Sequence, residues 1–352
     1  GIITNLGKKN RIDHMTGIFN KLEFEEEVKR AIEAKVGMGM MVLGMDDFKH
    51  VNDLYNRPFG DEVIRITAQK IQAMLPGNAA LYRLDGDEFG IIAKGATEDD
   101  MRRIYAAIHN TFRHQQEYNE NRYYCTLSAG CSIYPKDAET YVDILKCADY
   151  SLEYSKNVGK NRITFFSKDI LKHKERSLEL IELLREKIED DDYSEFELFY
   201  QPQVDAMSGA IMGAEALARW NSKKYGWVSP AEFIPLLEQS GLIIPLGKWI
   251  FKTAISKCVE WVKFNDEFVM SINLSYVQLT EPGFIPFMKS AIDENGLSTE
   301  NVVVELTESY MAKGTNSVKE IFDRIRELGF KIAMDDFGTG YSSLDILKNS
   351  PA

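Results

Sequence analysis

After Tyr193, short apolar segments alternate with helical stretches, and this alternation narrows the possible folds more than any other feature of the sequence. Strands are predicted at residues 197–204, 211–218, 268–274, 302–306 and 330–335. Because parallel neighbours need a long crossover, usually a helix, this order predicts a largely parallel α/β sheet or barrel. Only the short turn at 207–209 joins the first two strands, so that pair is predicted to be antiparallel.

The residues before 168 follow a different pattern, in which a hairpin is combined with strands joined by helices. A turn at residues 85–88 separates strand-like segments at 80–84 and 89–93, as in a β-hairpin. This mixture predicts an α+β domain with helices packed on an antiparallel sheet. A charged segment with helical spacing follows, and the 352 residues suffice for two domains. The predicted divisions are a first domain at 1–168, a linker helix at 169–192 and a second domain at 193–352.

The chain is acidic, with 42 Lys and Arg residues, 54 Asp and Glu residues and a formal net charge of -12. Nucleic-acid backbones are bound through Lys and Arg, so this balance argues against a nucleic-acid polymer as partner. The longest strongly apolar stretch, residues 38–45, is shorter than the about 20 residues that span a bilayer. No membrane segment is therefore predicted in these 352 residues. Whether one precedes Gly1 stays undecided. The four cysteines form no CxxC pair, which favours free thiols and a cytoplasmic protein.

Four successive predicted strands of the second domain end in a side chain that metals favour. These residues are Glu215, Asn273, Glu305 and Asp335, and Asp336 follows directly. A single acid at a strand end is more often solvated or a helix cap, but the carboxyl ends of barrel strands converge on one face. Several oxygen ligands meeting there would suit Mg²⁺ or Mn²⁺. Only one histidine follows residue 114, which argues against a histidine-based zinc site.

These strand ends lie within an ordered series of motifs in residues 198–347. The motifs are GAEALARW, SPAEFIPLLEQSGLI, SINLSYVQL, VVVELTES and IAMDDFGTGYSSL. The series resembles the EAL family of cyclic di-GMP phosphodiesterases, which open the cyclic dinucleotide to linear pGpG. The resemblance implies a TIM-like barrel with an antiparallel first strand, two Mg²⁺ or Mn²⁺ ions and two-metal hydrolysis.

The resemblance also assigns a role to each matching residue. The implied metal ligands are Glu215, Asn273, Glu305, Asp335 and Asp336, and the implied catalytic residues are Glu215, Asp335 and Asp336. The implied substrate contacts are Gln201, Leu217 and Arg219. Glu308 would anchor the loop at residues 336–343, which the family uses in metal binding and dimerisation, so a homodimer through the EAL domain is expected. A barrel has eight strands, and only about five are predicted before Ala352, so we expect the 352-residue chain alone not to hydrolyse cyclic di-GMP.

Residues 13–166 carry a second ordered set of motifs. They are DHMTGIFNKLEF, MDDFKHVNDLYNRPFGDEV, RLDGDEFGII and ADYSLEYSKNVGKNR, and the set resembles the GGDEF family of diguanylate cyclases. Two positions depart from that family: Gly44 stands where it has a Mg²⁺-binding Asp, and Asp85 where it has Gly. Phosphoryl transfer depends on metals and positioned charge, so a degenerate cyclase is predicted. The residues kept for GTP binding are Asn52, Asp61, Asp87 and Lys156, with Lys160 in place of a family arginine.

The predicted function is cyclic di-GMP signalling, with a hydrolytic EAL domain and a regulatory, GTP-binding GGDEF domain. Two alternatives stay open at this point. One is a catalytically silent receptor for cyclic di-GMP or GTP that acts through a protein partner. The other is a residual diguanylate cyclase, which the retained Asp87 and guanine-binding residues favour. Metal-dependent turnover of the cyclic dinucleotide or of GTP distinguishes the three.

Overall fold

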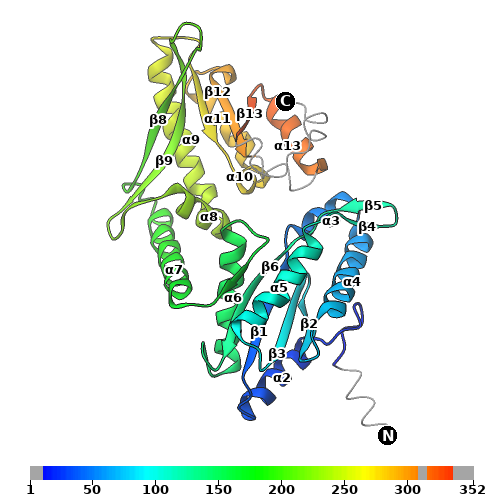
Figure 1. Cartoon of the computed structure of the whole chain (residues 1–352). Helices are drawn as coiled ribbons and strands as arrows, with labels where there is room; N and C mark the ends of the chain where they lie inside the picture. The colour runs from blue at the N-terminus through cyan, green and yellow to red at the C-terminus, as the bar shows by residue number, and fades with distance from the viewer. Residues whose placement is uncertain (1–10, 308–314, 336–352) are drawn as a thin grey trace. The chain divides into compact units, whose positions relative to one another are not determined.

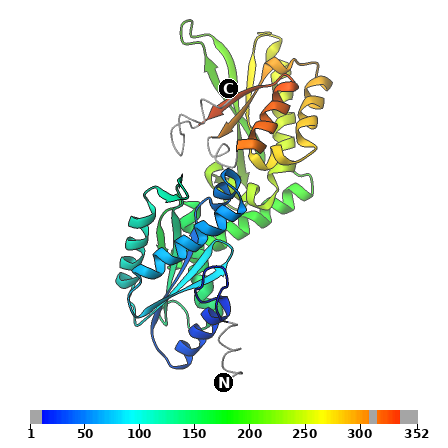
Figure 2. The same ribbon diagram turned by 90° about the vertical axis from the view of Figure 1, so that its right-hand side faces the viewer.

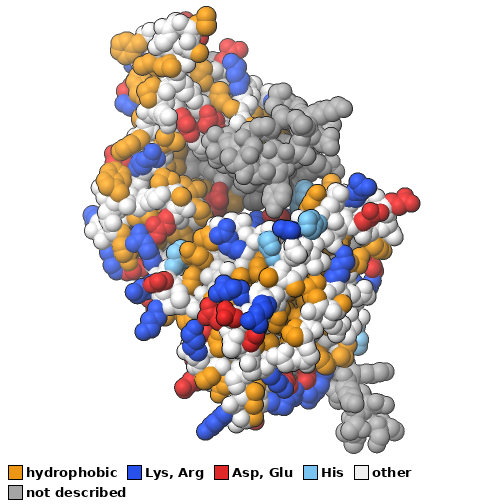
Figure 3. All heavy atoms as spheres, viewed as in Figure 1, with side chains coloured by type: hydrophobic (Ala, Val, Ile, Leu, Met, Phe, Trp, Pro, Cys, Tyr) orange, Lys and Arg blue, Asp and Glu red, His pale blue; other side chains and the backbone are white. Residues whose placement is uncertain are grey.

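The computed structural model describes residues 11–307 and 315–335 (Figure 1). The chain forms two compact units, residues 1–175 and 176–352. Each unit has its own sheet and its own buried core, and we describe each by itself. Within the described residues, no helix is long and apolar enough to cross a membrane. On the face drawn in Figure 3, Lys and Arg side chains are mixed with Asp and Glu side chains.

The first unit contains a five-stranded sheet with the order β2-β3-β1-β6-β7. Its strands are β1 (Met38–Met45), β2 (Ala79–Asp85), β3 (Glu88–Lys94), β6 (Leu127–Tyr134) and β7 (Ile163–Phe165). A separate hairpin consists of β4 (Gln116–Tyr118) and β5 (Asn121–Tyr123). The central strand β1 is antiparallel to both of its neighbours, as predicted. The edge strand β7 is instead parallel to β6, because a whole helix crosses between the two.

Helices cover both faces of this sheet (Figure 2), which explains why all eight residues of β1 are buried. The helices are α2 (Lys21–Glu33), α3 (Phe48–Leu54), α4 (Arg57–Met74), α5 (Glu98–Phe112) and α6 (Tyr141–Asn157). Successive side chains of a strand point to opposite faces. Met41 and Leu43 accordingly join a core with α4 and α5, whereas Met40 and Val42 join one with α2 and α6.

The second unit contains a mixed sheet with the order β10-β9-β11-β12-β13, and β8 pairs with β9. Its strands are β8 (Phe196–Val204), β9 (Ile211–Ser222), β10 (Gly226–Val228), β11 (Val269–Asn273), β12 (Val302–Thr307) and β13 (Lys331–Asp335). The pair β8 and β9 is antiparallel, as the short turn predicted, and β9, β11, β12 and β13 are parallel. The prediction of five strands was too low, since β10 is a sixth. Closure into a barrel stays a prediction.

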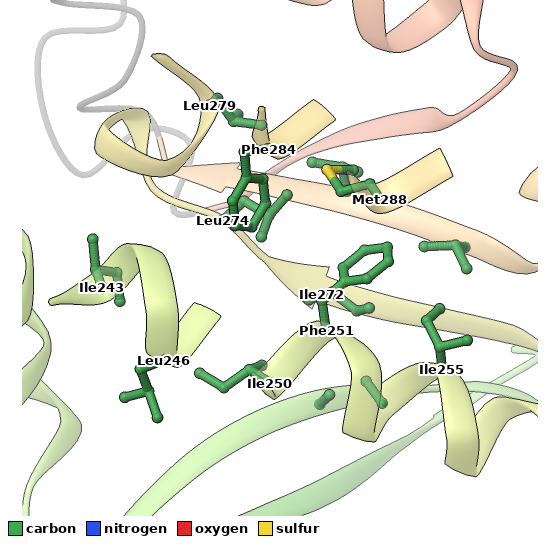
Figure 4. Close-up of a cluster of buried hydrophobic side chains, with 14 of the residues drawn as sticks. Ile243, Leu246, Ile250, Phe251, Ile255, Ile272, Leu274, Leu279, Phe284 and Met288 are labelled. Carbon is green, nitrogen blue, oxygen red and sulfur yellow. The ribbon is translucent and has the colours of Figure 1, made fainter. Parts of the chain in front are cut away.

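The parallel strands are joined by helices, as the alternation predicted. These are α8 (Pro230–Ser240), α9 (Ile243–Val262), α10 (Tyr276–Thr280), α11 (Phe284–Glu294), the 3₁₀ turn η1 (Thr299–Asn301) and α13 (Thr315–Glu327). Figure 4 shows Ile250, Phe251 and Ile255 of α9 packed near Ile272 of β11 and Met288 of α11. Burying such side chains contributes about 1.5–3 kcal/mol each, and this packing fixes one face of the sheet as the core.

Helix α7 (Lys168–Glu189) contains the boundary between the two units. Its C-terminal half buries Leu180, Leu184 and Ile188 in the core of the second unit. Arg176 donates from Nε and Nη2 to the two carboxylate oxygens of Glu232, at 2.6 and 3.1 Å. This half of the helix is therefore a packed element of the second unit. All four cysteines are buried free thiols, which confirms the prediction of no disulfide among them.

Candidate functional site

In the second unit, the candidate site lies on the sheet face opposite the core with α9. Along β9, Ala214 and Ala216 are buried in that core, whereas Glu215, Leu217 and Arg219 alternate with them and are only half-buried. In the register of β8 and β9, Gln201 lies opposite Glu215. The predicted substrate contacts Gln201, Leu217 and Arg219 thus share one face with Glu215.

Three of the predicted metal ligands come together on three adjacent strands. The Nδ2 atom of Asn273, at the end of β11, donates a hydrogen bond to Oε1 of Glu215 at 2.6 Å. In the parallel pairing of β11 and β12, Glu305 lies opposite Asn273. The backbone of Asp335 ends β13 opposite Thr307, two residues beyond Glu305. Asp336 and Glu308 lie outside the described residues.

The donor set at these strand ends decides which ion would fit. Glu215, Asn273 and Glu305 supply carboxylate and amide oxygens, the ligands that Mg²⁺ and Mn²⁺ prefer. The 2.6 Å hydrogen bond from Nδ2 of Asn273 to Oε1 of Glu215 shows that these two side chains lie in contact. No three His, Cys, Asp or Glu side chains in the described ranges 11–307 and 315–335 form a metal cluster. The side chains of the other two predicted ligands, Asp335 and Asp336, lie outside the described part of the chain.

Arg219 lies four residues from Glu215 along β9, about 13 Å at about 3.3 Å per residue. Its guanidinium carbon lies 5.2 Å from the centroid of the Phe199 ring, and Nη1 donates to the carbonyl oxygen of Ala218 at 2.9 Å. The Phe199 ring also contacts Trp227 edge-on, with the centroids 5.9 Å apart. Sequence reasoning missed this aromatic pair, although Phe199 alternates with Gln201 on β8 and so belongs to the same face.

In the first unit, the turn between β2 and β3 is held by an arginine. Nε and Nη2 of Arg83 donate to the carbonyl oxygen of Gly86, at 3.2 and 2.9 Å, and Nη1 donates to Asp13. Gly86 has a φ of +40°, in the left-handed region that glycine adopts without strain. These contacts fix the loop that carries Asp85 and Asp87.

The predicted guanine-binding residues lie beside the start of α4. Oδ1 of Asn52 is buried and accepts no hydrogen bond within the described structure. It packs against Gly60, where an added Cβ would lie 1.8 Å from that oxygen, so the helix approaches it only because residue 60 is glycine. Asp61 follows Gly60 and is exposed. The structure thus brings Asn52 and Asp61 to one place and leaves a buried acceptor there.

The position that the family fills with a metal-binding Asp is Gly44 on β1. It pairs with Glu88 of β3 on one side and with Ser128 of β6 on the other. A Cβ added to Gly44 would lie 2.6 Å from Nζ of Lys156, so the ammonium group sits directly over this glycine. Burial and the nearby Asp87 raise the pKa of Glu88, and Lys156 partly opposes that shift. The predicted metal position lacks a ligand and has a cation beside it.

Two further charges near this position are engaged in structural contacts. Lys160, which stands for the family's phosphate-binding arginine, forms an ion pair with Asp47 at 2.6 Å. Asp46 is buried and accepts from the hydroxyls of Thr126 and Ser128, at 2.7 and 2.6 Å, and from the backbone of Asn161 at 3.0 Å. Sequence reasoning did not single out Asp46, because its role depends on residues 80 or more positions away.

Comparisons with known proteins agree with this division into two α/β units. Residues 10–162 match the family described as diguanylate cyclase, GGDEF domain, and residues 182–352 match the EAL domain family. The fold and these matches define a two-domain protein of the GGDEF and EAL classes. The chain belongs to the proteins that carry a GGDEF domain and an EAL domain in tandem.

Two relatives match this chain along nearly its whole length. The chain is 29% identical over 365 residues to the bifunctional diguanylate cyclase/cyclic di-GMP phosphodiesterase MucR of Pseudomonas aeruginosa, covering 100% of this chain and 53% of that protein. It is 29% identical to the cyclic di-GMP phosphodiesterase NbdA of the same species, covering 99% of this chain and 45% of that protein. The chain thus spans about half the length of these curated relatives.

A solved structure supports the fold of the whole chain. It is the S helix-GGDEF-EAL part of Vibrio cholerae LapD, bound to c-di-GMP, with a TM-score of 0.68 and 17% identity. The match covers 99% of this chain and 82% of that chain. At this identity the likeness concerns the fold alone.

Proposed function

We propose that the protein acts in cyclic di-GMP signalling and that its EAL domain hydrolyses cyclic di-GMP to linear pGpG. The observation that carries this proposal is the convergence of Glu215, Asn273 and Glu305 on one sheet face. The phosphodiesterase names of the relatives support it. The carboxylate and amide oxygens on this face suit divalent cations, which would in turn bind a phosphodiester substrate.

The proposed ligands of two Mg²⁺ or Mn²⁺ ions are Glu215, Asn273, Glu305, Asp335 and Asp336. When bound, such ions acidify water and stabilise the attacking and leaving oxygens. Arg219 offsets phosphate charge in an otherwise acidic protein, while Gln201 and Leu217 line the groove beside Glu215. Asp336 helps to hold the second metal and orients the attacking water. Glu308 anchors the loop at residues 336–343, which we propose as the dimer contact.

For the first unit, we propose a regulatory GGDEF domain that binds GTP and makes no cyclic di-GMP. Gly44 supplies no metal ligand, and Asp85 adds negative charge to the phosphate-facing turn. The buried and unpaired Oδ1 of Asn52 supports a role as acceptor for guanine N–H groups. Release of cyclic di-GMP from GTP and Mg²⁺ at the rate of an intact cyclase would overturn this proposal.

The EAL proposal is tested in the full-length protein by following pGpG formation from cyclic di-GMP by chromatography, with Mg²⁺, with Mn²⁺ and with chelator, while the 352-residue chain alone is expected to give no cleavage. We expect metal-dependent cleavage that falls by about 100-fold or more in Glu215→Gln, because this variant keeps the shape but removes one ligand charge. Glu267→Gln makes the same change at an exposed position before β11 and serves as the matched control. Tight binding without cleavage in the unaltered protein would favour the receptor alternative.

A further inference from the structure

The placement of Lys156 follows from how α6 packs on the sheet of the first unit. Ile144, Ala148 and Leu152 recur every four residues on α6 and are buried against β1 and its neighbours. Lys156 is the next residue of that stripe. The helix lies so close to β6 that a Cβ on Gly130 would be 2.1 Å from the carbonyl oxygen of Ala148. The lysine therefore extends along the same sheet face and reaches β1.

The contact between Lys156 and β1 requires a glycine at position 44. A Cβ there would lie 2.6 Å from Nζ and 2.7 Å from Cε of Lys156, distances at which one of the groups must move. Among the described residues Lys156 makes no ion pair within 4.0 Å and no hydrogen bond, although its charge partly offsets the rise that burial causes in the pKa of the nearby Glu88 carboxyl. Lys160, four residues later, is held by Asp47. Of these two lysines, Lys156 is the one whose charge remains available to a ligand.

A divalent ion does not fit this position. Its expected carboxylate is missing at Gly44, and a metal there would face the like charge of the Lys156 ammonium. Asp85 and Asp87 of the adjacent turn, together with Glu88, would repel a triphosphate that arrives without a counter-charge. Lys156 supplies that counter-charge at the place left by the missing carboxylate.

We propose that the GGDEF domain binds GTP without a divalent metal, with the ammonium of Lys156 against the triphosphate in the position beside Gly44. This inference rests on the proposed function, which includes GTP binding by this domain. The same geometry explains why binding would not lead to turnover, because one ammonium neutralises phosphate charge but holds no activated oxygen. Lys156 is thus a ligand-binding residue whose effect depends on Gly44.

The test is calorimetric titration of the protein with GTP in EDTA and, separately, in excess Mg²⁺. We expect dissociation constants within about threefold of each other in the two conditions. Lys156→Met should weaken binding in EDTA by about tenfold or more, since it removes one charge-assisted contact to phosphate. Lys156→Arg should restore most of the affinity. Lys146→Met, an exposed lysine on the same helix, is the matched control and should bind as the unaltered protein does.

The variant Gly44→Asp best distinguishes metal-free GTP binding from metal-dependent GTP binding. Its carboxylate displaces and pairs with Lys156, so GTP binding should fall about tenfold in EDTA and recover in Mg²⁺. Circular dichroism and thermal unfolding check that each variant folds. Binding of GTP by the unaltered protein only in Mg²⁺ would overturn this inference and leave the GTP-binding proposal intact. Absence of binding at millimolar GTP in both conditions would overturn both.

Discussion

Two strand positions that face a candidate site differ in charge, Glu215 on β9 and Gly44 on β1. Each lies on a strand with partners on both sides, so its surroundings are set by the neighbouring strands and by the helix behind them. Beside Glu215 the sheet presents the Asn273 amide and, one strand further, the Glu305 carboxylate. Beside Gly44 it presents the Lys156 ammonium.

This difference determines what each site recruits from solution. Carboxylates that face one another are stabilised by a cation from solvent, whereas a site with its own ammonium attracts an anion. The loss of one carboxylate, at position 44, therefore does more than remove a ligand. It makes room for a lysine, whose ammonium takes the place of a carboxylate beside Glu88. The comparison predicts that cleavage by the EAL domain requires a divalent metal, whereas GTP binding by the GGDEF domain does not.

The largest effect should come from Asn273, which touches Glu215. Asn273→Ala removes an oxygen donor and should lower the turnover of cyclic di-GMP by about 100-fold. Asn273→Asp keeps an oxygen at that position and should retain far more activity. Steady-state kinetics with Mg²⁺ and Mn²⁺ measure both variants, and Asn157→Ala on an exposed part of α6 is the control. Equal activity of Asn273→Ala and the unaltered protein would remove this residue from the proposed ligand set.

A smaller effect is expected at Arg219, which faces the site without reaching the strand-end acids. Arg219→Ala should raise KM for cyclic di-GMP by about tenfold, because a charged hydrogen bond to phosphate is lost. The KM of Arg219→Lys should lie between those of Arg219→Ala and the unaltered protein. Kinetics separate this change from one in kcat, and Arg113→Ala tests the loss of an exposed arginine elsewhere. A change in kcat alone would contradict a role in substrate binding.

Asp46 provides a test of whether a carboxylate near Gly44 serves the fold or the ligand. Asp46→Ala leaves the hydroxyls of Thr126 and Ser128 without this acceptor, and the amide of Asn161 keeps only its hydrogen bond to Oγ of Ser128. It should lower the free energy of unfolding by about 2–4 kcal/mol, measured by denaturant titration. Asp53→Ala, at an exposed position on α3, should change it little. A fully stable Asp46→Ala variant would show that this cluster is dispensable.

The smallest effect concerns the pH dependence of stability at Glu88. Burial, together with the charges of Asp87 and Asp85, raises the pKa of Glu88. The protonated form of Glu88 is therefore favoured in the folded protein. Its contribution to stability is present below the unfolded pKa and is lost as the pH rises through the folded pKa. Glu88→Gln should therefore gain stability relative to the unaltered protein at pH 7.5 and resemble it near pH 4. Thermal unfolding across this range measures the difference. A loss of stability in Glu88→Gln at pH 7.5 would instead mean that the attraction of Lys156 outweighs burial.

Much of the second unit's fold could be predicted because its signals are local. The three-residue turn dictated an antiparallel β8 and β9, and strand-end residues on parallel neighbours meet at one edge. Strand β10 was not predicted, because three residues are too few to show a periodic pattern. The contact between Phe199 and Trp227 was not predicted either, because it depends on the pairing of β10 with β9.

The departures at Gly44 and Asp85 could be found in the sequence, but not their structural consequence. That Lys156 fills the space over Gly44 depends on the distance between α6 and the sheet, which close contacts at Gly130 set. The spacing of Ile144, Ala148, Leu152 and Lys156 carries a signal for it, since all four lie on one helix face. The spacing predicts the position of Lys156 only when it is known which strand this face of α6 covers.

Helix α7 also bears on how such proteins can be rearranged during evolution. Similarity to the EAL family begins at residue 182, yet Leu180, two residues earlier, is fully buried in the same core as Leu184 and Ile188. A recombination event that transferred residues 182–352 alone would expose an apolar cavity where Leu180 had been. A stable transferable EAL module would therefore need at least this turn of α7, and this half of the helix is part of the EAL domain's core rather than an exchangeable spacer.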